Sequence, residues 1–402
     1  MTASVLECDP KLRLRVLVII LLPTFVWLGI NSAHIRDARK QDFAAYWQAG
    51  HMILSGQDVY NSAEWIAERE LRGTAFHSEP TFHYPLPFAV LFSPLALLPI
   101  QTAYGIWLFF ELIALLSSII LLLNFYPNRG RYFELYIVAG VFLFRPAFAV
   151  IFNGQILAFI LFALSMAIRL FHHRHMFWGG FILGLLALKP NIGVPVLGLA
   201  IVWLFMEKNW KGILGVGSGC VILFLLGFAI DANWVLEYLP AGGDALYKYH
   251  MSVPTLWGVM GRLFASDQVS FIASIAAVFV VLWIEIYILL YAKYPRQPLE
   301  VFASIVPAAL LAAPYAWSHD QILLIPSMLY VMISLSVLRG NLRSALFLIG
   351  SVTLSISLAL LAYTLLHDVW SFLNSLLMWV LVMIFTPRKF EYGKIDGMNV
   401  TT

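Results

Sequence analysis

Charged residues are scarce in this chain of 402 residues, of which 12% are charged and 61% are hydrophobic. Water-soluble domains carry about 25% charged residues. This composition excludes an ordinary soluble domain and indicates an integral membrane protein. A transmembrane β-barrel would need a series of short segments with alternating polarity, and the sequence has no such series, so we expect membrane-spanning helices.

Cysteines are also scarce, and the sequence has no glycine-rich phosphate loop. Cys8, in the N-terminal tail, and Cys220, in an apolar stretch, are the two cysteines, so no disulfide, haem or zinc framework is expected. No glycine-rich loop that would cradle nucleotide phosphates is present, and no compact carboxylate set suggests a metal. We therefore expect no cofactor and assign no metal ligands, although two acids from different loops could still meet around a metal. The net charge of +3 is too small to imply a nucleic-acid partner.

Long apolar stretches run through most of the chain. Because a helix needs roughly 20 apolar residues to cross a bilayer, we predict a single all-α polytopic membrane domain, 1–402, with about 12 transmembrane helices. A stretch at 87–98 is too short to cross and is broken by Pro94, so we interpret it as re-entrant or interfacial. The glycine spacing at 180–184 and 215–219 predicts close helix packing. The predicted spans are 16–30, 104–125, 133–150, 155–171, 177–188, 192–206, 213–230, 271–291, 301–313, 321–338, 345–366 and 369–385.

The distribution of Lys and Arg orients these spans, because such residues stay on the cytoplasmic side in short loops. Most of them fall on one side if the chain starts in the cytoplasm, so both termini are predicted cytoplasmic. The long loops 31–86 and 231–270 then face outward, and we expect a bacterial inner-membrane protein whose site is extracytoplasmic. The N-terminus also fits a secretory signal, but cleavage would leave the first outer loop untethered, so we favour an uncleaved helix.

The first outer loop contains an acidic and aromatic segment. Phe43, Tyr46 and Trp47 repeat at helical spacing, which predicts a short interfacial helix with Asp42 at its N-terminus. The helix dipole favours a carboxylate at that end. Asn61 and Glu64 form a capping-box pattern, which predicts a second short helix.

Polar groups gather in the predicted outer turns. An ionisable side chain near the membrane core costs roughly 2.5 to 3.5 kcal/mol, so its presence there indicates a function. A set of cations, amides and a histidine on one side of the membrane suits a phosphorylated, hydroxyl-bearing substrate. The residues are Arg145, Asn153, Gln155, Lys189 and His319.

The order of these residues resembles glycosyltransferase family 87, a group of GT-C membrane glycosyltransferases. The group includes the polyprenyl-phosphate-mannose-dependent mannosyltransferases of mycobacterial phosphatidylinositol mannosides. The family often has two adjacent prolines after a tyrosine, whereas Tyr84-Pro85 is followed here by Leu86-Pro87. The likeness extends from about Asp42 to Ile325 and rests on Asp42 with Tyr46, Ser55-Gly56-Gln57-Asp58-Val59-Tyr60, Tyr84-Pro85, Asn153-Gly154-Gln155, Leu188-Lys189-Pro190 and Trp317-Ser318-His319-Asp320.

The resemblance implies a GT-C fold and a hexosyltransferase. The expected partners are a polyprenyl-phosphate sugar donor, with mannose favoured, a glycolipid or glycan acceptor, and the surrounding lipids. The resemblance also implies that Asp42 takes the proton of the acceptor hydroxyl, a role that a positioned carboxylate can fill. Direct displacement would invert the anomeric centre, so a β-linked donor would give an α-glycoside.

The leaving phosphate would need preorganised donors for its developing charge. Lys189, Arg145 and His319 are candidates, and we place His319 with Asp42 among the catalytic residues. The other expected substrate-binding residues are Tyr46, Asp58, Tyr60, Tyr84, Asn153 and Gln155.

Simpler interpretations stay open for several of these residues. Asp42 also fits a helix cap, Asp58 a turn, and Lys189 a side chain that snorkels at a span end. We interpret Asp320 and Asp368 as ordinary loop residues. A transporter or flippase for lipid-linked sugars is the alternative function, although transporters usually bury carboxylates near the midplane and show internal repeats, which we do not identify. A non-catalytic assembly partner with the same fold also stays open.

Overall fold

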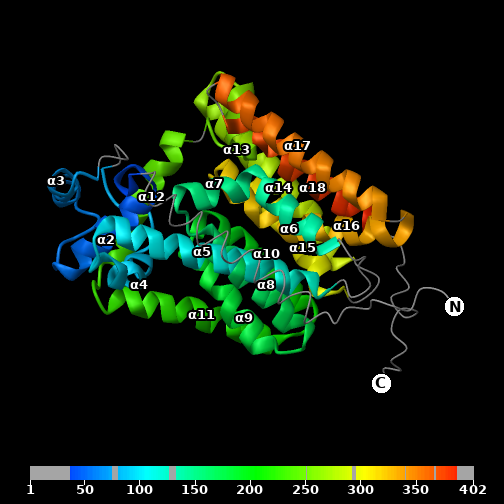
Figure 1. The fold of residues 1–402 in the computed structure, drawn as a ribbon, viewed down its shortest axis with the longest axis horizontal. Coiled ribbons are helices and arrows are strands. Elements are labelled where there is room, and N and C mark those ends of the chain that lie inside the picture. The colour runs from blue at the N-terminus through cyan, green and yellow to red at the C-terminus, as the bar shows by residue number, and fades with distance from the viewer. Residues whose placement is uncertain are drawn as a thin grey trace.

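The computed structural model describes residues 37–74, 80–125, 133–249, 251–291, 296–339, 341–365 and 368–386, and every regular element within them is a helix. Figure 1 shows α2, α3 and α4 together at one end of the long axis, with the other long and short helices filling the rest. The α-helices and 3-10 helices (η) are η1 Ala38–Lys40, α2 Phe43–Leu54, α3 Ser62–Arg72, α4 Leu86–Ala96, α5 Ile100–Leu123, α6 Phe133–Leu143, α7 Arg145–Asn153, α8 Leu157–His172, α9 Met176–Gly184, η2 Leu185–Leu188, α10 Pro190–Met206, α11 Trp210–Phe228, α12 Trp234–Tyr249, α13 Leu256–Leu263, α14 Asp267–Leu290, α15 Pro298–Ala312, η3 Ser318–Leu324, α16 Ile325–Arg339, α17 Asn341–Leu365, η4 Asp368–Ser371 and α18 Phe372–Phe385.

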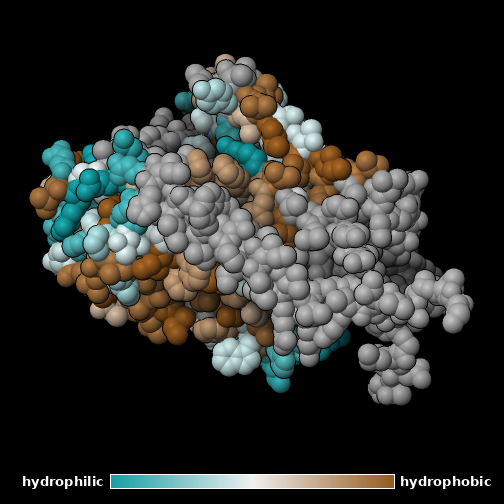
Figure 2. All heavy atoms as spheres, viewed as in Figure 1, coloured by the Kyte–Doolittle hydropathy of each residue, from teal (hydrophilic) through white to brown (hydrophobic). Residues whose placement is uncertain are grey.

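Five segments of the described residues are long and apolar enough to cross a membrane. They are Ile100–Leu123, Trp210–Phe228, Asp267–Leu290, Leu346–Tyr363 and Asp368–Phe385. Apolar side chains cover much of the surface visible in Figure 2, whereas hydrophilic residues gather at the end that carries α2 and α3. The chain is therefore a polytopic all-helical membrane protein. The predicted count of about 12 crossings stays a prediction, because several expected spans correspond to shorter apolar helices. The first expected span, 16–30, lies outside the described residues.

One predicted span is wrong, because residues 133–150 form two helices. α6 ends at Leu143, and Phe144 is extended, with φ −67° and ψ 111°, before α7 begins. Pro146 lies in the first turn of α7. Proline has no N–H, and its ring would collide with a carbonyl of the preceding turn, so Pro146 disfavours the continuation of α6 through it. The break brings Arg145 to the start of a new helix.

Pro94 does not break the 87–98 segment, contrary to the sequence-based expectation. α4 runs from Leu86 to Ala96 with Pro94 inside it. Proline cannot donate to the carbonyl of Val90, four residues earlier. The hydroxyl of Ser93 donates to that carbonyl instead, at 2.8 Å. The substitute hydrogen bond satisfies the acceptor that the proline leaves, so the helix continues for two more residues.

The predicted first outer loop contains the two short helices expected in it. α2 buries Phe43 and Tyr46 against α4, and the Phe43 and Phe92 rings meet edge to face at 5.3 Å. α3 begins after Asn61, whose side chain accepts from the backbone of Ala63 and Glu64. The capping box is only half formed, since Glu64 accepts from the N–H of Asp58 at 2.9 Å. Local sequence thus predicted both helices, and α2 packs on protein.

Glycines allow α9 and α11 to approach closely, as their spacing predicted. A Cβ on Gly180 would lie 2.0 Å from the carbonyl oxygen of Gly212, and one on Gly215 would lie 2.1 Å from that of Phe177. Both distances are far below contact distance, so only glycine fits. This packing holds α11 beside the segment that leads into η2 and Lys189.

Candidate active site

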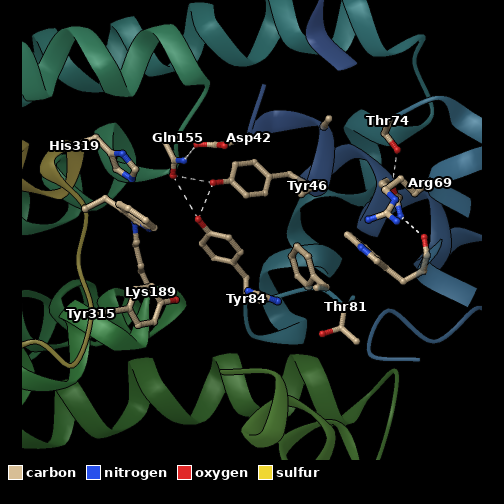
Figure 3. A pocket seen from close by; sticks show the side chains of 17 residues that line it. Asp42, Tyr46, Arg69, Thr74, Thr81, Tyr84, Gln155, Lys189, Tyr315 and His319 are labelled. Carbon is tan, nitrogen blue, oxygen red and sulfur yellow. Dashed lines mark hydrogen bonds between the residues drawn. The ribbon is translucent and has the colours of Figure 1, made fainter. Parts of the chain in front are cut away.

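A cavity of about 320 Å³ lies beside the N-terminus of α2. Segments far apart in the chain form its walls: α2, α3, the irregular segment 81–84, the residues joining η2 to α10, and the turn 315–320. Figure 3 places Lys189, Tyr315 and His319 at one end, Arg69 and Thr74 at the other, and Tyr46 and Tyr84 between them. The lining side chains are Asp42, Ala44, Ala45, Tyr46, Gln48, Trp65, Arg69, Thr74, Thr81, Phe82, His83, Tyr84, Gln155, Lys189, Tyr315, Trp317 and His319.

Asp42 lies at the N-terminus of α2 but does not cap it. Its backbone is helical, and its side chain makes no capping hydrogen bond. Oδ2 of the carboxylate instead accepts a hydrogen bond from Nε2 of Gln155 (Figure 3). The simple N-cap interpretation of Asp42 is therefore not supported, since the carboxylate points to the cavity side of the helix rather than to the first-turn amides.

Gln155 is oriented by the tyrosines that surround it. The hydroxyl of Tyr46 donates to Oε1 of Gln155 at 3.0 Å, and the hydroxyl of Tyr84 lies 3.4 Å from the same oxygen. With Oε1 engaged as an acceptor, the amide nitrogen is directed at Asp42. Gln155 is only 4% exposed. Its contacts fit a residue that orients Asp42, whereas the sequence suggested contact with phosphate or sugar.

Tyr46 and Tyr84 form the middle of the cavity wall. Their hydroxyls are 2.9 Å apart, and their rings meet edge to face with centroids 5.2 Å apart. Burial, followed by the neighbouring Tyr84 and Asp42, raises the pKa of Tyr46 well above its ordinary value. Burial also raises the pKa of Tyr84, although the positive charge of Lys189 opposes that shift. Both hydroxyls therefore stay protonated at neutral pH and keep their hydrogen atoms for donation.

Lys189 forms a buried ion pair with Asp320. Nζ lies 2.5 Å from Oδ1 of the carboxylate, and the two residues are 4% and 0% exposed. Burial alone would lower the pKa of Lys189, but the carboxylate of Asp320, and then Tyr84 and Asp42, raise it above its ordinary value. Lys189 does not snorkel to a lipid surface, because its ammonium points into the protein.

His319 shares the cavity wall with Lys189 and lies close to the same carboxylate. Its Nε2 is 3.8 Å from Oδ1 of Asp320. Burial lowers the pKa of His319, and Lys189 adds to this effect, while Asp320 opposes it. The imidazole is therefore neutral at neutral pH. It can donate or accept a hydrogen bond, but it does not bring a full positive charge to the cavity.

Arg145 and Asp368 hold the turn 315–320 from behind. Arg145 donates to the hydroxyl of Ser318, and Oδ2 of Asp368 accepts from the N–H of Ser318 at 2.8 Å. Asn191 donates to the carbonyl of Tyr315 at 2.9 Å. Arg145 does not line the cavity. Its predicted contact with phosphate stays a prediction, and its observed contact supports the turn that carries His319.

Three further predicted site residues also lie off the cavity wall. Oδ1 of Asp58 accepts from the N–H of Tyr60 at 2.8 Å, which is the turn interpretation of this residue. The hydroxyl of Tyr60 donates to the carbonyl of Tyr84 at 2.8 Å and so supports the return to α4. Asn153 is the last residue of α7. The sequence predictions of substrate contact for these three residues are not tested by these placements.

Several residues of interest were missed from the sequence. Asp320 was interpreted as an ordinary loop residue, which is wrong, since it is buried and paired with Lys189. Two carboxyls inside apolar helices, Glu111 in α5 and Glu285 in α14, are also completely buried. Glu285 accepts from Ser304 at 2.6 Å and from Trp379 at 2.8 Å, so it joins α14, α15 and α18. An acidic residue within a long apolar run is the signal that could have found both.

Within the described part of the chain, no group of three or more His, Cys, Asp or Glu side chains could hold a metal ion. The expected independence from metals stays a prediction.

About half of the residues that line this cavity lie in a region that matches a known family. The family model for glycosyltransferase family 87 matches residues 82–339, more than half of the chain. The chain belongs to glycosyltransferase family 87. Searches of curated proteins and of solved structures gave no match. The matched region contains Tyr84, Gln155, Lys189 and His319, whereas Asp42 and the other lining residues up to Thr81 precede it, so this family 87 protein completes the cavity with residues from outside the match.

Proposed function

We propose that this family 87 glycosyltransferase transfers a hexose, with mannose as the first candidate, from a polyprenyl-phosphate donor to a glycolipid or glycan acceptor. The observation that carries this proposal is one cavity that contains a carboxylate, Asp42, together with a buried ammonium, Lys189, and a neutral imidazole, His319. A carboxylate can take the proton of the attacking hydroxyl, and an ammonium can stabilise the charge that develops on a phosphate leaving group.

In the proposed reaction, Asp42 takes the proton of an acceptor hydroxyl as its oxygen attacks the anomeric carbon of the donor sugar. The bond between that carbon and the phosphate oxygen breaks, and polyprenyl phosphate leaves with the bonding electron pair. Lys189 stabilises the charge that develops on the phosphate, and His319 offers a neutral hydrogen bond. Attack from the face opposite the phosphate inverts the anomeric centre.

The membrane arrangement is part of the same proposal. The cavity faces the extracytoplasmic side of a bacterial inner membrane, both termini are cytoplasmic, and the five long helices cross together with shorter helices and the expected first span 16–30 to make about 12 spans. The concentration of hydrophilic surface at the end with α2 and α3 supports a water-facing cap there (Figure 2).

One observation supports the transporter alternative, and another opposes it. Glu111 and Glu285 are buried carboxyls within apolar helices, a placement that transporters use for coupled ions. Both oxygens of Glu285, however, already accept hydrogen bonds from Ser304 and Trp379, which is typical of a structural contact. Family membership favours the enzyme.

The proposal is tested by measuring sugar transfer from synthetic polyprenyl-phosphate mannose by purified protein in nanodiscs. Asp42→Asn should lower kcat by about 10²- to 10⁴-fold, the usual contribution of a general base. Asp37→Asn is the matched control, because Asp37 lies in the same loop but is exposed and off the cavity wall. NMR of the product should show an α-linkage from a β-linked donor.

Equal rates for Asp42→Asn and wild type would remove Asp42 from the chemistry. If mannose is not transferred, the same assay with polyprenyl-phosphate glucose, galactose and arabinose decides the sugar. Failure of wild type with every one of these donors would contradict the polyprenyl-phosphate class.

A further inference from the structure

Asp320 is a completely buried carboxylate beside the cavity, and both of its oxygens have defined partners. Oδ1 accepts from the ammonium of Lys189 at 2.5 Å, and Oδ2 accepts from the backbone N–H of Trp317 at 2.6 Å. His319 precedes it in the chain and lines the cavity with Trp317. One carboxylate therefore joins Lys189, on the η2 to α10 connection, to the turn that carries three other lining side chains, Tyr315, Trp317 and His319.

A buried ammonium needs such a partner. Removing one member of a buried ion pair leaves an uncompensated charge and is strongly destabilising. Lys189 is 4% exposed, and burial by itself lowers its pKa. Asp320 is the main group that reverses this effect, with smaller help from Tyr84 and Asp42. His319, the remaining titratable group beside the pair, is neutral at neutral pH because burial lowers its pKa.

The backing of the turn is separate from this ion pair. Asp368 accepts from the backbone N–H of Ser318 at 2.8 Å and from the hydroxyl of Ser371 at 3.1 Å. Arg145 donates to the hydroxyl of Ser318. These contacts hold the turn 315–320 against η4 and α7. The same turn is thus fixed by two acidic residues, and Asp320 is the one that pairs with the ammonium of Lys189 among the described contacts of the turn. This difference provides a matched pair of variants.

We propose that Asp320 is the positioning residue of the phosphate site, where it keeps the Lys189 ammonium charged and directed at the cavity. The role rests on the proposed function, in which Lys189 receives the phosphate of the lipid-linked donor. An ammonium has three N–H donors, and Asp320 accepts from one of them, so two remain for phosphate oxygens. Asp320 acts through Lys189 and need not touch the substrate.

The test measures the affinity of the full-length protein in nanodiscs for polyprenyl phosphate, the leaving lipid, from neutral to alkaline pH. Binding of this lipid requires no turnover. Asp320→Asn should weaken binding by about 10- to 100-fold at neutral pH, in line with the loss of a hydrogen bond between charged groups. Its affinity should also begin to fall at a lower pH than that of wild type, because Lys189 then lacks its counter-ion.

Two other variants separate this role from simple support of the turn. Asp368→Asn should keep the pH dependence of wild type, whatever its affinity, since Asp368 supports the turn through Ser318 and not through Lys189. Asp320→Glu retains the charge, so its affinity for polyprenyl phosphate should begin to fall at an alkaline pH close to that of wild type; we call this fall the alkaline limb. If Asp320→Asn folds poorly, the double variant Lys189→Met/Asp320→Asn removes both charges, and it should bind weakly with no alkaline limb.

An Asp320→Asn protein with the pH dependence of wild type would overturn the positioning role and leave the proposed function intact. An alkaline limb that persists in Lys189→Met/Asp320→Asn would do the same, because the titrating group would then not be Lys189. Absence of polyprenyl-phosphate binding by wild type would overturn both proposals together.

Discussion

Gln155 donates a hydrogen bond to the carboxylate of Asp42, although the two residues are 113 positions apart in the chain. Asp42 directly precedes α2 in the predicted first outer loop, whereas Gln155 follows α7 and lies within the region that matches the family. The hydroxyl of Tyr46 donates a hydrogen bond to the amide oxygen of Gln155. The carboxylate that we propose as the base is therefore oriented by the family region of the protein.

This contact predicts the kinetic effect of Gln155→Leu. Loss of the donor to a carboxylate should lower kcat by about 10- to 100-fold while the KM for the donor stays close to that of wild type. Steady-state transfer in nanodiscs measures both. Asn153→Ala, two residues away and off the cavity wall, is the comparison and should have a smaller effect on kcat. A raised KM with unchanged kcat for Gln155→Leu would instead restore the sequence-based expectation that Gln155 binds substrate.

Glu237, on α12, predicts a pH dependence of stability. Burial, followed by a hydrogen bond with Asp231 and the charge of Asp58, raises the pKa of Glu237 from 4.5 to about 7. The folded protein then holds this proton more tightly than the unfolded chain. The stabilising contribution is complete below pH 4.5 and is lost as the pH rises through about 7.

The melting temperature in detergent should accordingly fall between pH 4.5 and 7, and Glu237→Gln should flatten part of this slope because its side chain cannot ionise. Glu70→Gln is the control, because Glu70 is exposed on α3. The same slope in wild type and both variants would show that Glu237 does not titrate in this range.

The glycines of α11 predict a matched pair of stability variants. A Cβ at Gly215 would meet the carbonyl of Phe177, whereas a Cβ at Gly217 would have nothing within 4 Å. Gly215→Ala should push α9 and α11 apart and cost about 1 to 3 kcal/mol, the range for overpacking. Gly217→Ala should be neutral or stabilising by up to about 1 kcal/mol, through helix propensity. Thermal unfolding of both proteins provides the measurement, and equal melting temperatures would argue against close packing of α9 on α11.

The sequence by itself determined the class of protein and many of its local features. Apolar runs predicted the membrane helices, and spacing predicted α2, the start of α3 at Asn61 and the close contact between α9 and α11. These features depend on residues a few positions apart, so local patterns carry them. The errors at 133–150 and at Pro94 are local as well: apolar composition hid the break before Pro146, and the hydroxyl of Ser93 replaced the hydrogen bond that Pro94 cannot make.

Only the tertiary structure decided which of the polar residues meet. Sequence reasoning collected Asp42, Gln155, Lys189 and His319 at predicted outer turns, but it could not pair Asp42 with Gln155 or Lys189 with Asp320. Asp320 in particular looked like a loop residue, because its burial depends on α7, η4 and the η2 to α10 connection packing around its turn. Contacts between residues more than a hundred positions apart arise from the packing of whole helices, and no local pattern encodes them.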